Sequence, residues 1–557
     1  MATRLNTKVN RNIALFVCVW VLTFVLYLPA AQAGFVSDFI GWLNELKRNS
    51  FGSYINGRDF NVKSLYQVTQ IITYVFFRLF GLHAWLWHLL FITLHSLNAC
   101  ILYVFFKTLF TDAGIQRAKE IAAAGVLLFC VSPYFSEVIV WEPSFHFLTG
   151  LMSILVILRL TQLYLQKSNP KYIWFALLVF ILSTHAIELF YTTPWLVLAL
   201  ILFYRVGLQW DKVVCRRAVL YFFLPLLALF VGHLVEYRLI YGTWVAHIGY
   251  SVLTGIDVRI LLSKPFKYLF HILFLGRFFT HKALVYNFLS SYTGIAICYV
   301  LVCTGIYAMI QAGKIDIKAK LCLLLLVWTG IALAIMVPLW FPEDFLIIYD
   351  RYTYMPCAFI YMLVPLLLSY ISIRKVAMGI YLLIVLANLR FAIQVNRYWM
   401  KSAKVVNNLL DTYTPANNKI VLLLDLPEGL HGASMISARS DSSRFKLMMH
   451  LLRPGEPVTG EMYDVASFNT ESPTDGVHVT IINDSTVRVT QNQFGTWWWY
   501  DGYGAINYEN AAYRFNNIDG HKYNLVLKRP YKQYELKFNT GGVWKTADWS
   551  KKNMDQY

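Results

Sequence analysis

Long apolar stretches recur along most of this 557-residue chain, and they constrain its fold more than any other feature. A helix needs about 20 mostly apolar residues to cross a bilayer, and about eleven segments meet that requirement. Only 14% of the residues are Asp, Glu, Lys or Arg, against about 25% in soluble domains. The sequence therefore predicts an α-helical multi-span membrane protein rather than a soluble enzyme. The predicted spans lie at roughly 13–33, 83–106, 119–136, 146–165, 171–187, 190–206, 217–237, 292–312, 318–340, 353–372 and 376–394.

The charge balance divides the chain into two parts. Residues 1–394 contain 31 Lys and Arg against 15 Asp and Glu, whereas residues 395–557 contain 18 against 16. We predict a transmembrane domain over 1–394 and a separate folded domain over 395–557, which is long enough for one domain. The basic excess lies between apolar segments, so it indicates membrane topology and not nucleic-acid binding.

The second part has the sequence pattern of a small α/β or mostly β domain. A polar helix is expected over 395–418, followed by a buried type of strand at 419–425. A helix is expected within 434–452, and alternating apolar residues predict later strands. Those strands lie at roughly 478–482, 486–490, 523–527 and 534–538.

Lys and Arg gather in alternate loops, which places the N-terminus on the cytoplasmic side by the positive-inside rule. The short loops on the other side carry acids, and Arg351 is their only basic residue. Eleven spans then place 395–557 outside the cytoplasm. The apolar segment 265–280 is interpreted as lying in the membrane interface. If that segment crosses instead, the C-terminal domain lies on the opposite side.

The first apolar segment has two interpretations. Its basic start and the later Ala31-Gln32-Ala33 imitate a signal peptide with a cleavage site. The apolar run is longer than a usual signal, so we expect a retained span. Two long outside segments follow from the predicted topology, at 34–82 and roughly 238–291, and such segments are where a membrane enzyme would build a site.

Four short segments carry a more specific signal. His88, His95 and Asn98 are seven and three residues apart, so they share one face of a predicted span. In order, the segments resemble membrane glycosyltransferases of the C superfamily (GT-C), most closely the protein O-mannosyltransferases that carry tetratricopeptide repeats. The resemblance covers roughly 35–370, and the chain shows no such repeat. The other three segments are Ser132-Pro133-Tyr134-Phe135-Ser136-Glu137-Val138-Ile139-Val140-Trp141, Thr184-His185-Ala186-Ile187-Glu188 and Asp350-Arg351-Tyr352-Thr353-Tyr354-Met355-Pro356.

Two departures from the family pattern are visible. Ser132 stands where the family has His, and the Lys of the family's Ser-Lys-Glu segment is missing before Glu188. The resemblance implies a polyprenyl-phosphate-linked sugar donor, transfer on the non-cytoplasmic face, and an essential acid in the first outside loop. The family often has two adjacent acids there, whereas this chain has one, Asp38.

Asp38 is the predicted catalytic base. It follows an apolar span and is flanked by Phe35, Val36 and Phe39, so we expect partial burial that raises its pKa. A base of this kind would take the proton of an acceptor hydroxyl as its oxygen attacks the anomeric carbon. The alternative is a solvated loop acid or a helix cap.

The leaving group of this chemistry is a lipid phosphate, which a guanidinium stabilises bidentately. Arg351, with Tyr352 beside it, is the predicted phosphate-binding residue. The alternative is an arginine that pairs with Asp350 or Glu343. Lys264 and Arg277 belong to a basic, aromatic-rich stretch of the second long outside segment, where ordinary interfacial snorkelling is the alternative.

Glu137, Glu188 and His88 complete the predicted substrate-binding set, because all three fall toward the outside ends of their spans. His95 and Asn98 lie deeper, where hydrogen bonds between helices are expected. No clustered ligand motif is present, so no metal or other cofactor is expected. Trp497-Trp498-Trp499-Tyr500 would suit a sugar, although core packing or contact with the bilayer also fits.

The leading hypothesis is a bacterial inner-membrane glycosyltransferase (a hexosyltransferase) with its C-terminal domain in the periplasm. It would move one sugar from a polyprenyl-phosphate donor to an acceptor hydroxyl on a protein, lipid or polysaccharide. A transporter of lipid-linked glycans and a membrane scaffold with a partner-binding C-terminal domain are the alternatives. The sequence identifies neither the sugar nor the acceptor.

Overall fold

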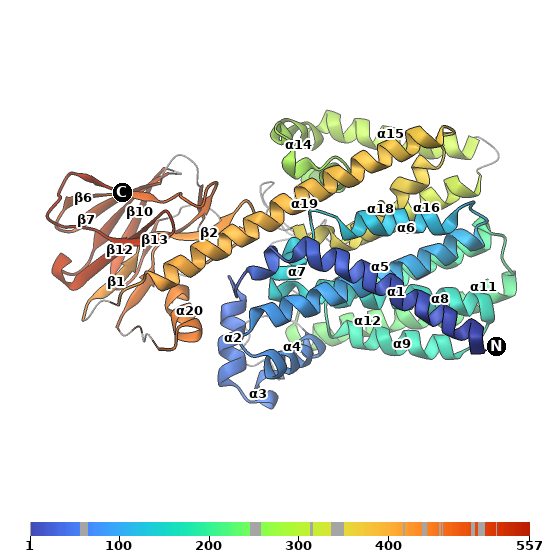
Figure 1. Cartoon of the computed structure of the whole chain (residues 1–557), viewed down its shortest axis with the longest axis horizontal. Coiled ribbons are helices and arrows are strands. Elements are labelled where there is room, and N and C mark those ends of the chain that lie inside the picture. The colour runs from blue at the N-terminus through green and yellow to red at the C-terminus, as the bar shows by residue number, and fades with distance from the viewer. Residues whose placement is uncertain are drawn as a thin grey trace.

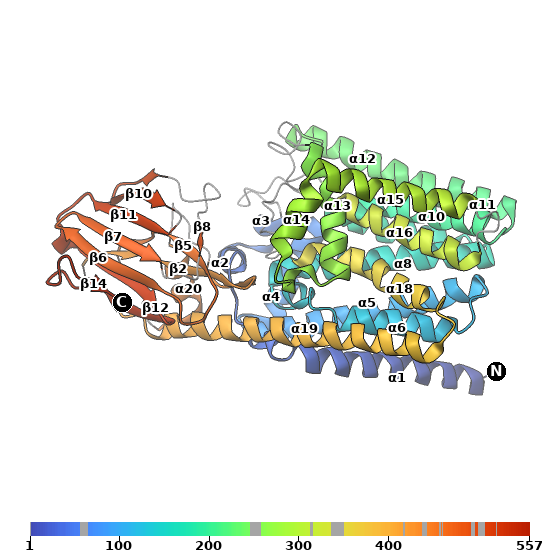
Figure 2. The same ribbon diagram turned by 90° about the horizontal axis from the view of Figure 1, so that it is seen from above.

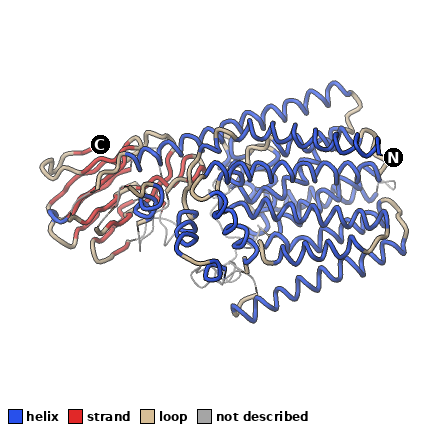
Figure 3. The backbone as a smooth tube through the Cα atoms, turned by 60° about the horizontal axis from the view of Figure 1, so that its bottom comes forward, coloured by secondary structure: helices blue, strands red, loops and turns tan. Residues whose placement is uncertain are grey.

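The computed structural model of the chain shows a long helical bundle joined end to end to a domain of β-sheets (Figure 1). Helices fill the bundle, and the strands are confined to the C-terminal domain (Figure 3). The N-terminus lies at the end of the bundle that is remote from this domain (Figure 1). The structure describes residues 2–55, 65–244, 258–311, 316–335, 350–415, 418–436, 443–455, 458, 460–491, 496–498, 507–519 and 521–557.

Among the described residues, seven helical segments are long and apolar enough to cross a membrane, as expected for an integral membrane protein. An eighth is present if α14 (Lys282–Ser290) and α15 (Tyr292–Gln311), which are bent by 80°, form one span. The seven are Ala84–Asp112 (α5), Glu142–Lys167 (with α8, Phe145–Lys167), Glu188–Gly207 (with α10, Thr193–Leu202), Lys212–Tyr241 (with α12, Leu224–Tyr241), Ile317–Ala334 (α16), Asp350–Leu368 (with α18, Tyr354–Leu368) and Arg374–Asp411 (α19).

The prediction of eleven full spans is therefore not confirmed, and the difference lies in short helices. The apolar part of α1 (Ala2–Tyr27) is Ile13–Tyr27, and α9 (Lys171–Thr184) has 14 residues. The predicted span at 119–136 corresponds to α6 (Ala118–Cys130), which has 13 residues. At about 1.5 Å per residue, α6, α9 and the apolar part of α1 each reach about 20 Å, which is less than the hydrocarbon core. The end of the predicted span 318–340 lies outside the described residues.

The described parts of both predicted outside segments include short helices at the end of the bundle nearest the C-terminal domain (Figures 1 and 2). The first contains α2 (Phe39–Arg48), α3 (Phe51–Ile55) and α4 (Gln67–Phe80). The second contains α13 (Val258–Leu273), a 3-10 turn at Gly276–Phe278, and α14. The predicted interfacial segment 265–280 falls on α13 and this turn, and α13 is not among the helices that meet the requirements for crossing.

Helix α19 connects the two parts without a loop. Its 38 residues span about 57 Å, about twice the thickness of a hydrocarbon core. The apolar first half runs beside α1, and the second half reaches the β-domain (Figure 2). Along this second half, α19 buries Asn396, Trp399, Ala403 and Val406 on one face at helical spacing, and Asn396 contacts Leu26 and Ser136 of the bundle. The predicted boundary at 394/395 thus falls inside a continuous helix.

The C-terminal domain is built from three sheets and the helix α20 (Arg444–Leu452). The strand orders are β13-β12-β1-β4, β14-β6-β7-β11-β10-β9 and β3-β2-β5-β8, and β1 pairs in parallel with both β12 and β4. The predicted strands are confirmed as β1, β6, β7, β11 and β12. Trp497 and Trp498 belong to strand β8, whereas Trp499 and Tyr500 are outside the described residues. The strands are β1 (Ile420–Leu423), β2 (Leu426–Leu430), β3 (Ala433–Ser434), β4 (Met462–Asp464), β5 (Ser467–Thr470), β6 (Val477–Asn483), β7 (Thr486–Gln491), β8 (Thr496–Trp498), β9 (Tyr508–Glu509), β10 (Tyr513–Asp519), β11 (Lys522–Leu527), β12 (Tyr534–Thr540), β13 (Val543–Thr546) and β14 (Asp555–Gln556).

A buried carboxyl in this domain generates a test of its stability. Asp425 follows β1, is fully buried, and accepts a hydrogen bond from the amide of Asn539 at 2.7 Å. Burial raises the pKa of Asp425 well above 3.8. The unfolded chain therefore releases this proton at lower pH than the folded chain, and the free energy of unfolding falls as the pH rises above 3.8.

We predict that Asp425→Asn weakens this pH dependence, because the amide oxygen still accepts from Asn539 and carries no charge. Thermal unfolding of the full chain, followed between pH 5 and pH 8, measures the effect. A wild-type protein and a variant with the same slope against pH would contradict the prediction.

Candidate active site

Two segments made of short helical turns place carboxylates and an arginine at the end of the bundle nearest the C-terminal domain. Pro133 follows the end of α6, and the chain then forms α7 (Ser136–Val140) and a 3-10 turn at Glu142–Ser144. The second segment is the 3-10 turn Asp350–Thr353 before α18, where the Thr353 hydroxyl donates to the Asp350 carbonyl at 2.8 Å. Each turn begins with an acid that points into the bundle and not to water.

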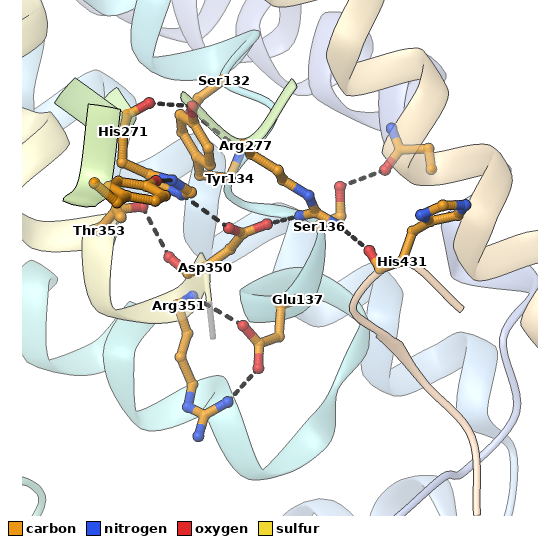
Figure 4. A network of polar contacts seen from close by, with 12 residues as sticks. Ser132, Tyr134, Ser136, Glu137, His271, Arg277, Asp350, Arg351, Thr353 and His431 are labelled. Carbon is orange, nitrogen blue, oxygen red and sulfur yellow. Dashed lines mark hydrogen bonds and ion pairs between the residues drawn. The ribbon is translucent and has the colours of Figure 1, made fainter. Parts of the chain in front are cut away.

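Glu137 and Arg351 form a buried ion pair that joins these segments (Figure 4). The amide of Arg351 also donates to Glu137 Oε2 at 2.9 Å. The guanidinium lies 4.6 Å from the Trp141 ring centroid and 4.8 Å from that of Tyr352. Burial raises the pKa of Glu137, and the Arg351 charge opposes that rise. Of the predicted site residues, Arg351, Glu137 and Tyr352 are thus brought together.

Arg277 takes part in a second ion pair beside the first, with Asp350 (Figure 4). Its other terminal nitrogen donates to the backbone carbonyl of His431, which belongs to the C-terminal domain. His271 Nε2 lies 3.3 Å from Asp350 Oδ1, and the Tyr134 hydroxyl donates to the His271 carbonyl. Burial lowers the pKa of Arg277 to about 10 and that of His271 to about 3. At neutral pH, Arg277 is therefore charged and His271 is neutral.

Sequence analysis missed Asp350 and His271 as members of this network. The sequence offers Asp350 as an alternative partner of Arg351. In the structure, Arg351 pairs with Glu137 and Arg277 pairs with Asp350. In the sequence, the sign that His271 belongs to a polar network is its position on an apolar helix that also carries two lysines. Glu343, the other alternative partner, lies outside the described residues.

Lys264 and Lys267 are buried on α13, one helical turn apart. Burial, with a contribution from the neighbouring Lys267 charge, lowers the pKa of Lys264 to about 8. Burial raises the pKa of the next residue, Tyr268, and the Arg351 charge opposes that rise. The predicted basic residue Lys264 thus lies on the helix that flanks the Arg351 group.

His88 is buried on α5, where Nε2 lies 3.1 Å from Glu142 Oε1 and Nδ1 lies 3.0 Å from the Ala31 carbonyl. Deeper in the same helix, His95 Nδ1 and Asn98 Nδ2 lie 2.9 Å and 3.1 Å from the Tyr354 hydroxyl. His95 and Asn98 therefore make the hydrogen bonds between helices that the sequence predicted.

Glu188 lies apart from the arginine group. It accepts a hydrogen bond from the Tyr66 hydroxyl, and the Tyr66 ring stacks on His146 with centroids 6.5 Å apart. The neighbouring Phe147 contacts Tyr352, with centroids 5.9 Å apart. Aromatic side chains thus lie between Glu188 and the Arg351 group.

Asp38 corrects one expectation from the sequence, because its side chain is 51% exposed and not partly buried. It precedes α2, whose buried face is formed by Phe39, Ile40 and Leu43. Since those residues face the core, Asp38 points outward at the start of the helix. Its Oδ1 lies 3.7 Å from an Arg444 nitrogen at the start of α20.

Within the part of the chain that the structure describes, no group of three or more His, Cys, Asp and Glu is arranged to hold a metal ion.

Comparisons with known proteins give a fold-level similarity and no family. No protein-family model and no curated protein matches the chain. The solved structures that are similar to this chain include two of ArnT from Cupriavidus metallidurans, one bound to undecaprenyl phosphate and one in the apo state. Each is 14% identical with a TM-score of 0.33, and they cover 82% and 84% of this chain and 93% and 94% of their own. At this identity and TM-score, the similarity assigns neither a family nor a function. Nor does any comparison show the resemblance to O-mannosyltransferases with tetratricopeptide repeats.

The Glu137–Arg351 pair generates a stability prediction. Arg351→Met leaves a buried carboxylate without its cation, which costs about 3–5 kcal/mol of the free energy of unfolding. The double variant Glu137→Gln/Arg351→Met is expected to be more stable than Arg351→Met alone, because it leaves no charge behind. Denaturant titration of the purified protein in detergent measures both.

Arg488→Met makes the same change on an exposed sheet face and is expected to have little effect. Strictly additive losses in the double variant would contradict the pairing.

Proposed function

We propose that this protein is a GT-C membrane glycosyltransferase that moves one sugar, a hexose, from a polyprenyl-phosphate donor to an acceptor hydroxyl. The observation that carries the proposal is the convergence of segments that are remote in the sequence. The 132–141 and 350–356 segments meet through Glu137 and Arg351. The 88–98 segment meets them through the contacts of His95 with Phe135 and Tyr354, and His88 contacts Glu142, the residue after Trp141. These are three of the four segments on which the family resemblance rests.

Arg351 is the proposed ligand of the donor phosphate. The sugar–phosphate bond breaks as the acceptor oxygen attacks, so negative charge grows on the leaving phosphate. A guanidinium has five N–H donors, so an arginine that is oriented by a carboxylate on one side can still direct other donors at a phosphate. In this proposal Glu137 orients Arg351, and the stacked rings of Trp141 and Tyr352 keep water from its flat faces.

The lysines of α13 would add to the same anion site. Two buried ammonium groups one turn apart repel each other, which is one cause of the lowered pKa of Lys264. A negatively charged phosphate relieves such repulsion, so donor binding is expected to favour the charged form of Lys264. Glu188, with its aromatic neighbours, is proposed to bind sugar hydroxyls. His88 is proposed to support this end of the site through Glu142.

Asp38 is the proposed general base. It would accept the proton of the acceptor hydroxyl as the new bond forms to the anomeric carbon, and polyprenyl phosphate would leave with the electron pair of the broken bond. One displacement without a covalent intermediate inverts the anomeric carbon. Exposure suits a carboxylate that meets an acceptor arriving from water. The proposed location is the bacterial inner membrane, with the C-terminal domain in the periplasm.

Sugar transfer by the purified protein in nanodiscs tests the proposal. The donors are a panel of polyprenyl-phosphate sugars, and a native membrane extract supplies the acceptor. We predict that Asp38→Asn lowers the rate by about 10²–10⁴-fold, because a general base contributes about that much. Arg351→Lys is expected to lower the rate as well, because an ammonium does not reproduce the fork of the guanidinium.

Glu45→Gln is the matched control, since Glu45 is a second acid on the same short helix α2. Loss of transfer in Glu45→Gln with full activity in Asp38→Asn would move the base to Glu45. If the wild type transfers none of the sugars but moves a lipid-linked glycan across sealed vesicles, the transporter alternative replaces the enzyme.

A further inference from the structure

A tight hairpin of the C-terminal domain reaches into the ion-pair network of the bundle. Strands β2 and β3 are antiparallel, and Leu430 pairs with Ala433 across the two-residue tip His431-Gly432. Both tip residues have positive φ angles, 48° and 83°, as in the type I′ turns that close two-residue hairpins. Glycine adopts this conformation freely, whereas histidine does so at a cost, which suggests that the His431 side chain has a use there.

The side chain of His431 fixes the tip between two other elements. Its ring lies against Tyr398 of α19, with centroids 4.4 Å apart. On the other side, Nε2 lies 3.0 Å from the Glu471 carbonyl and Nδ1 lies 3.4 Å from the Glu471 carboxylate. These contacts hold the ring in one place and therefore fix the direction of the main-chain carbonyl of the same residue.

That carbonyl accepts a hydrogen bond from Arg277 (Figure 4). The other terminal nitrogen of Arg277 pairs with Asp350, which immediately precedes Arg351 in the chain. The amide of Arg351 in turn donates to Glu137. Two polar contacts and one peptide bond therefore connect the hairpin tip to the proposed phosphate-binding arginine.

Arg277 is buried and directs its two terminal nitrogens at partners within the protein. This geometry suits an arginine that orients Asp350. The sequence alone instead indicates an arginine that contacts a ligand. If the tip carbonyl moved away, a buried guanidinium would lose an acceptor, and Asp350 would lose a fixed partner. The position of the 350–353 turn would then be less well defined.

The hairpin is held against the bundle at further points along its length. The Ser402 hydroxyl of α19 donates to the Ala433 carbonyl at 3.3 Å. The amide of Ser37 donates to the Met435 carbonyl at 3.0 Å, and Arg444 donates to the Ser37 carbonyl at 3.0 Å. The tip is thus the end of a docked element, and its contact with Arg277 is one of several between the two domains.

We propose that the His431-Gly432 tip of the C-terminal domain is a positioning element of the donor-phosphate site, which acts through Arg277 and Asp350 on Arg351. The inference rests on the proposed function for the identity of the ligand. It assigns to the C-terminal domain a direct part in donor binding, and it makes Arg277 and His431 positioning residues.

The test uses His431→Gly in the full-length protein. Glycine keeps the turn and its carbonyl but removes the ring that fixes them, so the variant is expected to fold. Asn553→Gly is the matched control, because Asn553 is another positive-φ residue of the same domain, with φ 59°. Binding of tritiated undecaprenyl phosphate, with undecaprenol as the uncharged comparison, reports on the phosphate site. Hydrogen exchange of peptides that cover 350–356 reports on the turn that carries Arg351.

We expect His431→Gly to weaken binding of the phosphate about fivefold and to speed exchange at 350–353, with Asn553→Gly changing neither. In a double-mutant cycle, His431→Gly is expected to cause no further loss once Arg277→Gln is present, because the tip acts through Arg277. A purely structural role would instead give additive losses.

The contrary outcomes separate the two proposals. Wild-type protein that binds undecaprenyl phosphate and undecaprenol equally would overturn the phosphate site and the inference with it. Wild-type protein that prefers the phosphate, with His431→Gly binding as tightly and exchanging as slowly as the wild type, would overturn the inference alone. So would a His431→Gly effect that persists in full on the Arg277→Gln background.

Discussion

The site depends on one constraint, which is that charged side chains buried at one end of an apolar bundle must be neutralised by partners. Glu137, Asp350 and Arg277 are buried and Arg351 is partly buried, and an isolated buried charge of this kind costs several kcal/mol. Each charge therefore requires its partner, and the partners come from segments far apart in the chain. Two ion pairs thus fix how the 130s turn, the 350s turn and the α13 region meet. The neutral His271 adds a polar contact to Asp350 without adding a charge.

Local patterns in the sequence predicted the features that depend on nearby residues, namely individual strands and the face of one helix. Alternating apolar residues located four strands of the C-terminal domain, and the buried run before Asp425 located a fifth, β1. Spacing along one helix put His95 and Asn98 on a shared face, and both indeed bond to the same tyrosine. Apolar length was less informative, since α6 and α9 are apolar enough to suggest spans but end too early.

Partner choice between remote segments could not be read from the sequence. Arg351 has an acid as its chain neighbour, yet it pairs with Glu137, while Asp350 pairs with Arg277. Only the three-dimensional arrangement decides between such pairings. The exposure of Asp38 has a similar origin. Its apolar neighbours are buried, but the start of α2 turns Asp38 away from them, toward Arg444. The catalytic roles of these residues stay proposals.

Helix α19 has a consequence for anyone who wishes to exchange the C-terminal domain between proteins of this kind. A helix without a break transmits rotation as well as distance. One residue added within it would turn everything beyond that point by about 100° and advance it by about 1.5 Å. The docked hairpin, Arg444 and the Tyr398 ring would then face new directions together. A chimaera joined within α19 must therefore preserve helical phase, and an insertion of seven residues, close to two full turns, is the smallest that nearly does so.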